Sequence, residues 1–176
     1  MRLAIFLVLA ITGTAADLWT KHAIFTWLGN PGESHPYWLV EPYVGFQTAV
    51  NMGALFGLGQ GFGWLFSLLS IVAAAGIVYW LFVLKACKSL WLTVAMGLVM
   101  GGIFGNLYDR LGIPKLPDPM KGGVRDWILF TYGEYTWPNF NIADSLLVTG
   151  ATMLAIFSFF FSDPREQKEI PSQEFS

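Results

Sequence analysis

The sequence predicts a mainly α-helical, polytopic membrane protein with four transmembrane helices and a small β element on the outer face. Hydrophobic residues make up 55% of the 176 residues and charged residues only 12%, too little charge to cover a soluble domain of this size. The mean hydropathy of +0.53 agrees with this. Three runs without any charged residue also follow one another: Phe62–Leu84, Leu90–Leu107 and Ser145–Ser162. Each approaches the ~20 apolar residues that a helix needs to cross a bilayer.

The first transmembrane helix is predicted over Leu3–Trp27, although Asp17 and Lys21 interrupt its apolar residues. An alternative is a cleavable signal peptide, because Arg2 precedes an apolar stretch that ends in Thr14-Ala15-Ala16. Apolar and aromatic residues resume after Asp17, however. Asp17 and Lys21 are also four residues apart, so they share a helix face and can neutralise each other. These features favour a helix that is retained.

The third run contains glycines at a regular spacing. Gly97, Gly101 and Gly105 are four residues apart, which places them on one face of a helix. A stripe of small residues lets two helix backbones approach closely, so we expect this helix to pack tightly against a neighbour.

The distribution of Lys and Arg predicts that both termini lie in the cytoplasm. The basic residues of one side are Arg2, Lys85, Lys88, Arg165 and Lys168, and those of the other are Lys21, Arg110, Lys115, Lys121 and Arg125. The first set lies in a tight turn and at the termini, where the positive-inside rule applies most strongly. The loops Leu28–Gly61 and Tyr108–Asn141 then face outward. We expect one membrane domain over residues 1–162 and a polar cytoplasmic tail over residues 163–176.

The outward-facing loops are predicted to carry β structure. Tyr37–Val50 is rich in aromatic and β-branched residues and is bounded by Pro and Gly, which indicates a strand. Trp127–Phe130 and Tyr135–Trp137 flank Gly133-Glu134, which indicates a hairpin.

That hairpin would bring Asp126 back beside Asn141 and Asp144. Two close carboxylates cannot both ionise easily, so one keeps a proton while the other is charged. This is the state that can activate water as a base and protonate a leaving amine as an acid. In the alternative interpretation, Asp144 only caps the fourth helix and Asp126 pairs with Arg125.

Other polar residues gather near the outer boundary of the predicted helices. Ionisable groups at membrane level are costly and usually mark either function or mutual pairing. Asn51, Asn106 and Asn141 could hydrogen-bond a substrate backbone, or they could cap helices and turns. Asp109 and Arg110 could belong to a site, or they could form an ion pair at the interface.

Several function classes find no support in the sequence. The net charge of −2 offers no basic surface for nucleic acid. The lone Cys87 excludes a multi-thiolate metal site, and neither His22 nor His35 falls in an H-E-x-x-H spacing. A small membrane transporter or proton-relay subunit is an alternative function. Relay residues would be spread through the membrane depth, whereas the charged residues here collect at one face.

Five motifs occur in one order along most of the chain. They are Asp17-Leu-Trp-Thr-Lys21 (D-x-x-x-K), Asn51-Met-Gly-Ala-Leu-Phe-Gly57 (N-x-G-x-x-F-G), Gly101-Gly-Ile-Phe-Gly-Asn-Leu-Tyr-Asp-Arg110 (G-G-x-x-G-N-x-x-D-R), Val124-Arg-Asp126-Trp (V-x-D-F) and Phe140-Asn-Ile-Ala-Asp144 (F-N-x-A-D). The third motif is the most specific, and each one alone would be weak. Together they resemble the signal peptidase II family, the bacterial aspartic peptidases that process lipoproteins in the membrane.

The resemblance implies that Asp126 and Asp144 are the catalytic pair. It implies that Asn51, Asn106, Arg110 and Asn141 bind the substrate, and that Asp17, Lys21, Gly53 and Asp109 support the site. The implied substrates are prolipoproteins that carry diacylglyceryl on a cysteine, and cleavage occurs just before that cysteine without a metal or an organic cofactor.

We expect a monomer among membrane lipids, located in the bacterial cytoplasmic (inner) membrane with its active site at the outer face. Two features depart from the family pattern. The loop Gly112–Lys121 is longer than we expect, and its role is open. Arg125 and Trp127 replace the more usual apolar residue and Phe.

Overall fold

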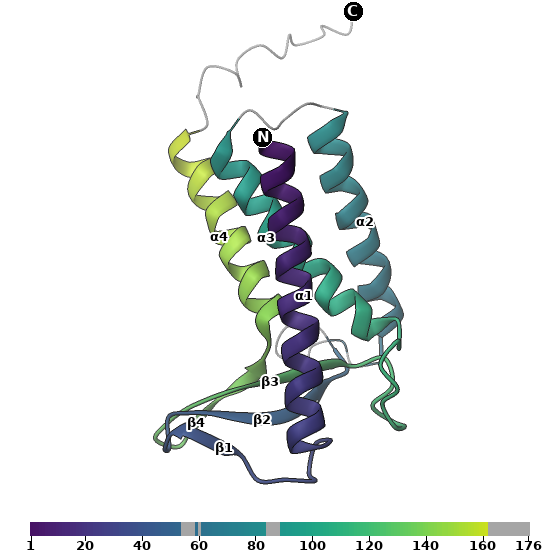
Figure 1. Cartoon of the computed structure of the whole chain (residues 1–176), viewed down its shortest axis with the longest axis vertical. Coiled ribbons are helices and arrows are strands. Elements are labelled where there is room, and N and C mark those ends of the chain that lie inside the picture. The colour runs from purple at the N-terminus through teal and green to yellow at the C-terminus, as the bar shows by residue number, and fades with distance from the viewer. Residues whose placement is uncertain (54–58, 60, 84–88, 162–176) are drawn as a thin grey trace, which may run out of the picture.

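Four long helices stand side by side and carry a small sheet at one end, as Figure 1 shows. The computed structural model describes residues 1–53, 59, 61–83 and 89–161. The helices are α1 (Arg2–Leu28), α2 (Gly63–Phe82), α3 (Leu90–Arg110) and α4 (Ile142–Phe161). Each is long and apolar enough to cross a membrane, which confirms the predicted class. The predicted polar tail and residues 54–57 of the second motif lie outside the described residues.

The helix α3 lies at the centre of the bundle. In its most apolar stretch of 18 residues, 56% of the residues are buried, compared with 11% in the corresponding stretches of α2 and of α4. Its glycines explain how neighbours approach so closely: a Cβ atom on Gly97 would lie 2.9 Å from Leu9 Cβ of α1, and one on Gly101 would lie 3.3 Å from the Ala10 carbonyl oxygen. On the α4 side, a Cβ on Gly102 would lie 2.5 Å from the Ala143 carbonyl oxygen. The predicted close packing is confirmed.

The helix α1 is continuous through its two charged residues. Its buried residues recur every three or four positions, which makes one stripe toward the bundle. They are Phe6, Ala10, Gly13, Asp17 and Lys21. The prediction that Asp17 and Lys21 share a face is therefore confirmed, and the charged pair lies on the buried stripe.

The sheet consists of four antiparallel strands in the order β1-β2-β3-β4. Its strands are β1 (Tyr37–Val40), β2 (Val44–Asn51), β3 (Val124–Tyr132) and β4 (Tyr135–Phe140). The prediction of one strand over Tyr37–Val50 is wrong, because a turn divides it into β1 and β2. Pro42 lies in that turn, and proline has no N–H to donate to a strand ladder.

The predicted hairpin is confirmed as β3 and β4. Tyr132 pairs with Tyr135, so Gly133 and Glu134 form a two-residue loop. Gly133 has a φ of 60°, the positive value that such loops require. The strand β4 leads almost directly into α4, which begins at Ile142 rather than at Ser145 as predicted. Asp144 therefore lies inside the first turn of the helix.

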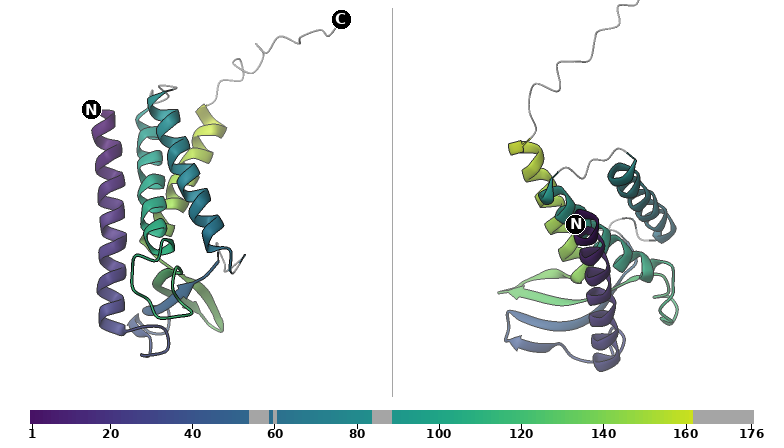
Figure 2. Two further views of the ribbon diagram at one scale, coloured as in Figure 1. Left: turned by 90° about the vertical axis from the view of Figure 1, so that its right-hand side faces the viewer. Right: turned by 45° about the horizontal axis from the view of Figure 1, so that its top comes forward.

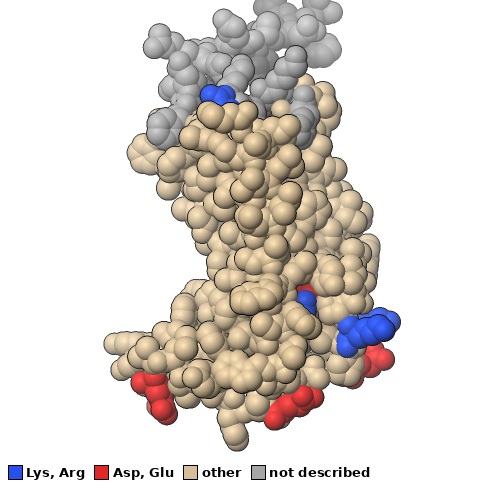
Figure 3. Space-filling view, in the orientation of Figure 1, with Lys and Arg blue, Asp and Glu red and all other residues tan. Residues whose placement is uncertain are grey.

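The sheet projects to one side of the helical bundle, and the N-terminus lies at the opposite end, as the views in Figure 2 show. On the face shown in Figure 3, acidic and basic side chains gather toward the sheet end and a basic patch marks the other end. The band between them is uncharged on this face. This distribution suits a protein whose middle part is surrounded by lipid.

The close contact at Gly102 yields a test of the packing. We expect Gly102→Ala to lower the free energy of unfolding by about 1–3 kcal/mol, since the new methyl group must push α4 away from α3. Gly76→Ala in α2 is the matched control, because a Cβ there meets nothing within 4 Å. That substitution should be neutral or stabilise by up to about 1 kcal/mol, since alanine favours helix. Thermal unfolding in detergent measures both, and equal stabilities would contradict the packing argument.

Candidate active site

The first turn of α4 is held by a reciprocal pair of side chains. The Asn141 Oδ1 atom accepts a hydrogen bond from the Asp144 backbone N–H at 2.9 Å. The Asp144 Oδ2 atom accepts one from the Asn141 backbone N–H at 3.2 Å. This is a capping box, so the interpretation of Asp144 as a helix cap is confirmed. It uses only one carboxylate oxygen, because Oδ1 instead accepts a hydrogen bond from Asn106 Nδ2 at 2.8 Å.

Asp126 lies beside this turn, on β3, with only 3% of its surface exposed. Its Oδ1 atom accepts a hydrogen bond from Asn141 Nδ2 at 2.6 Å. The expectation that the hairpin brings Asp126 beside Asn141 and Asp144 is confirmed. Among the described residues, the two carboxyl groups are connected through Asn141 rather than by a hydrogen bond to each other.

The alternative pairing of Asp126 with Arg125 is wrong. Neighbouring residues of a strand point to opposite faces of the sheet, so the two side chains diverge. Arg125 contacts Asp109 instead, whose Oδ1 atom accepts from Nε at 3.1 Å and from Nη2 at 2.8 Å. The Asp109 Oδ2 atom also accepts from the Arg125 backbone N–H at 3.0 Å. Asp109 thereby ties the end of α3 to β3.

The environment of Asp126 changes its acidity. Burial raises the pKa of its carboxyl well above the usual range, and the neighbouring Asp144 carboxylate raises it further. The hydrogen bond from Asn141 and the charge of Lys21 act in the opposite direction. Because the raised pKa dominates, Asp126 keeps its proton at pH values at which an exposed aspartate has lost it.

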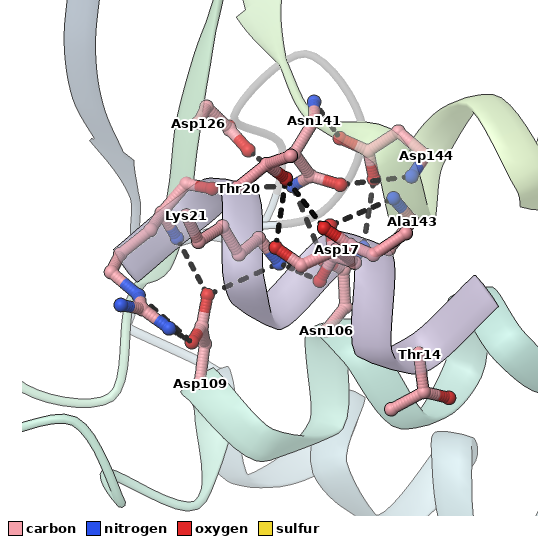
Figure 4. A network of polar contacts seen from close by, with 12 residues as sticks. Thr14, Asp17, Thr20, Lys21, Asn106, Asp109, Asp126, Asn141, Ala143 and Asp144 are labelled. Carbon is pink, nitrogen blue, oxygen red and sulfur yellow. Dashed lines mark hydrogen bonds and ion pairs between the residues drawn. The ribbon is translucent and has the colours of Figure 1, made fainter. Parts of the chain in front are cut away.

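Lys21 lies at the centre of the polar residues drawn in Figure 4. Its side chain is fully buried, and Nζ lies 2.7 Å from Asp17 Oδ2 and 3.2 Å from Asp109 Oδ2. The same ammonium donates to Asn106 Oδ1 at 2.9 Å. An ammonium can only donate, so it fixes the orientation of the Asn106 amide, with the oxygen toward Lys21 and the NH2 group toward Asp144.

Asp17 links the same ammonium to α4. Its Oδ1 atom accepts a hydrogen bond from the Ala143 backbone N–H at 2.9 Å. The negative charge also lies at the positive end of the α4 dipole, which is favourable. Gly105 makes room for it, since a Cβ there would lie 2.5 Å from Asp17 Oδ2.

Arg110 and Asn51 shape the opposite wall of the site. Arg110 Nη2 donates to the Gly53 carbonyl oxygen at 3.1 Å, and its guanidinium lies 5.5 Å from the centre of the Phe66 ring. Asn51 Oδ1 accepts from the Gly53 N–H at 2.9 Å. Of the two alternatives for Asp109 and Arg110, the ion pair between them is wrong, because Asp109 pairs with Lys21 of α1 and Arg125 of β3.

A groove of about 1070 Å³ opens beside the two aspartates. Of the predicted site residues, it is lined by Asp126, Asp144, Asn51, Asn106 and Arg110. Its other walls are mostly apolar and come from the sheet and from the surface of α4. The other predicted site residues do not line the groove; they are Asp17, Lys21, Gly53, Asp109 and Asn141. Asn141, expected to bind substrate, is fully buried and uses its side chain within the protein.

Two residues that contact the buried charges of the site, Arg125 and Gly105, have roles that the sequence does not predict. Arg125 stands out in the sequence only as a departure from the family and as a partner for Asp126, and Gly105 only as a packing residue. A charged residue between Val124 and Trp127 in a buried strand needs a buried partner, which was a usable signal. Gly105 carries no comparable signal, because its role depends on where Asp17 lies in space. Within the described part of the chain, no group of three or more His, Cys, Asp or Glu residues is placed to hold a metal ion.

Comparisons with known proteins identify similar chains. A family model described as Signal peptidase (SPase) II matches residues 9–160. The chain is 58% identical over 162 residues to a lipoprotein signal peptidase of Rhodopirellula baltica, covering 90% of this chain and 73% of that protein. It is 34% identical over 168 residues to the lipoprotein signal peptidase of Geobacillus thermodenitrificans, covering 96% and 98%.

Solved structures share the fold. One bacterial membrane enzyme superimposes with a TM-score of 0.75 over 97% of this chain and 94% of its own, at 24% identity. A second superimposes with a TM-score of 0.73 over 89% of this chain and 94% of its own, at 26% identity. The combination of a helical bundle with a small sheet is therefore an architecture found in experimentally determined membrane enzymes.

The buried ammonium yields a test of the network. We expect Lys21→Met to lower the free energy of unfolding by about 3–5 kcal/mol, because two carboxylates lose their buried partner. Lys121→Met is the matched control, since Lys121 is exposed and the same substitution there should change stability little. Unfolding of the detergent-solubilised proteins measures both effects. Similar stabilities for the two variants would show that Lys21 does not hold the site together.

Proposed function

Because the chain belongs to the signal peptidase II family, we propose that it removes prolipoprotein signal peptides with Asp126 and Asp144 as an aspartic catalytic pair. Family membership makes the chain a membrane protease that acts on prolipoproteins. The aspartic mechanism is supported by one observation above all. Two carboxyl groups from different elements line one groove, and both accept hydrogen bonds from Asn141, Asp126 from its side chain and Asp144 from its backbone N–H.

The charges around the pair support a single shared proton. The cations are Lys21, Arg110 and Arg125, and the carboxyl groups are Asp17, Asp109, Asp126 and Asp144. Three positive charges face four acidic groups, so the cluster is neutral when one carboxyl is protonated. A net charge is costly in a partly desolvated site, and the proton belongs to the pair as a unit. Because Asp126 is more deeply buried than Asp144, the shared proton is expected on Asp126.

The reaction then follows the acid–base chemistry of a carboxyl pair. The ionised Asp144 takes a proton from a water molecule whose oxygen attacks the carbonyl carbon of the scissile peptide bond. The protonated Asp126 gives its proton to the carbonyl oxygen as the tetrahedral intermediate forms. The C–N bond breaks when the leaving nitrogen receives the proton that Asp144 took from water, and the hydroxyl proton of the intermediate returns to Asp126 as the new carboxyl group forms. Asn106, fixed by Lys21, keeps the Asp144 carboxylate oriented throughout.

The groove suits a peptide that carries a lipid. Its polar end has Asn51 and Arg110 beside the aspartates, where a peptide backbone could be hydrogen-bonded. Leu147, Val148 and Ala151 extend its apolar wall along α4. We therefore propose diacylglyceryl-modified prolipoproteins as substrates, cut just before the lipidated cysteine, with the acyl chains along this wall.

The two aspartates yield the direct test. We expect Asp126→Asn and Asp144→Asn each to slow cleavage of a lipidated prolipoprotein by about 10²–10⁴-fold, because Asn keeps the shape but cannot exchange the proton. The double variant should be scarcely slower, since the residues act as one unit. Both should still fold, because a neutral amide costs less to bury than a carboxylate. The mass of the substrate before and after incubation measures cleavage.

The control is Asp118→Asn, which removes an exposed aspartate on an outer loop and should cleave normally. A substrate without the diacylglyceryl group tests the lipid requirement in the same assay. Near-normal cleavage by either single variant at matched membrane levels would exclude the aspartic mechanism.

The proposed location is the bacterial inner membrane, with the groove at the outer face and both termini in the cytoplasm. The sheet and the N-terminus lie at opposite ends of the helices, which supports placing them on opposite sides. A transporter or proton relay is less well supported, because the charged network gathers near the sheet and α2 contains no charged residue. We propose that the chain works as a monomer, since residues of one chain complete the site.

The orientation is tested with a reporter enzyme that is active only outside the cytoplasm. We expect no activity when it follows Ser176, and activity when it is inserted between Gly133 and Glu134 at the tip of the hairpin. The positive-inside distribution is the physical reason for this expectation. The opposite pattern of activities would reverse the proposed orientation while leaving the fold unchanged.

A further inference from the structure

A second cleft, of about 290 Å³, lies on the other face of β3 from the active-site groove. We call it the α1 cleft. The residues that matter for its chemistry are His22 and Phe25 of α1, Tyr108 of α3, Lys115 of the loop, and Arg125 of β3. The long loop Gly112–Lys121, whose role the sequence leaves open, forms one wall through Pro114, Lys115 and Leu116.

Arg125 presents unused donors to this cleft. Only 6% of the residue is exposed, and its hydrogen bonds to Asp109 use Nε, Nη2 and the backbone N–H. No hydrogen bond within the described part of the chain uses Nη1, although Arg125 lines the cleft. A guanidinium has five N–H groups, and Nη1 is not among the fully buried atoms that lack a partner, so its donors are open to the solvent of the cleft. The cleft is the place from which an acceptor could reach them.

The rim of the cleft is basic rather than acidic. Lys115 and His22 are both exposed there, and no Asp or Glu is among the described residues that line it. The carboxylate of Glu33, which lies near the cleft, accepts hydrogen bonds from the Asn30 backbone N–H at 2.9 Å and from Asn30 Nδ2 at 3.0 Å. An anion that enters therefore meets a guanidinium and an ammonium without a competing carboxylate on the wall. Arginine with lysine is the usual combination for binding phosphate oxygens.

The surroundings favour a phosphate that is attached to a lipid. The cleft lies at the sheet-proximal ends of α1 and α3, where the helices leave their apolar segments. Leu18 and Phe25 add an apolar surface next to the basic groups, and the Phe25 ring centre lies 5.8 Å from the Arg125 guanidinium. A phospholipid in the adjoining leaflet would place its phosphate near Arg125 and Lys115 and its glycerol carbons against this surface.

We propose that the α1 cleft binds a phosphate group, carried by the head group of a neighbouring phospholipid or free in solution. The Arg125 guanidinium and the Lys115 ammonium are the donors. This site is separate from the proposed catalytic groove. It is connected to that groove, because Asp109 holds Arg125 and also contacts Lys21, which orients Asn106.

Binding is tested on the full chain in detergent with three separate probes: phosphatidylglycerol, diacylglycerol and inorganic phosphate. Native mass spectrometry measures how much of each lipid is retained, and thermal unfolding measures stabilisation by inorganic phosphate. Lys115→Ala should weaken phosphatidylglycerol binding by about tenfold, the size of one charge-assisted hydrogen bond. The control Lys121→Ala removes an exposed lysine of the same loop that does not line the cleft, and it should bind like the parent chain.

Each outcome has a defined meaning. Phosphatidylglycerol retention that depends on Lys115, without stabilisation by inorganic phosphate, supports the site with a lipid as the source. Stabilisation by millimolar inorganic phosphate that depends on Lys115 supports the site with free phosphate as the source. The proposal is overturned if the Lys115 and Lys121 variants bind alike, or if Lys115→Ala lowers the retention of diacylglycerol as much as that of phosphatidylglycerol. Both variants alter exposed side chains, so loss of folding does not confuse the result.

Discussion

The structure depends on keeping one ammonium group, that of Lys21, charged and fully buried. Such a charge is tolerated only where carboxylates neutralise it and hydrogen bonds use its protons. Asp17 and Asp109 meet the first requirement at 2.7 and 3.2 Å, and Asn106 meets the second at 2.9 Å. Each partner also holds a further element, because Asp17 binds the start of α4 and Asp109 binds β3. One buried charge thereby sets the positions of three helices and the sheet.

This arrangement explains why the two aspartates of the groove differ. Asp144 lies in a helix turn, and Asn106 and the Asn141 backbone hold its two oxygens. Asp126 lies in a strand, is more deeply buried, and receives one hydrogen bond from Asn141. Burial raises the pKa of the Asp126 carboxyl and favours its neutral form, although the charge of Lys21 acts in the opposite direction. The surroundings of the two carboxyl groups therefore differ before any substrate arrives.

The sequence predicts the helices well, because long apolar runs have few alternatives, and it predicts the β3–β4 hairpin from Gly133 and its flanking aromatic residues. Its errors arise where polar residues find distant partners. The predicted start of α4 stops short of Asp144, since its hydrogen bonds to Asn106 and Asn141 cannot be read from local hydrophobicity. The predicted pairing of Arg125 with Asp126 is wrong because neighbouring residues of a strand point to opposite faces of the sheet. Asp144 shows that the two interpretations of one residue need not exclude each other, since a helix cap can also line a groove.

If cleavage takes place in the proposed groove, the apolar wall of that groove has a consequence for the kinetics. Val148, which lines the groove, is 59% exposed on the surface of α4, so the groove is continuous with the face that meets lipid. A membrane-anchored peptide can therefore arrive by lateral diffusion without ever entering water. Its effective concentration is then a number of molecules per unit area of bilayer. Added lipid would dilute enzyme and substrate relative to each other and slow the reaction, even when their amounts per litre stay the same.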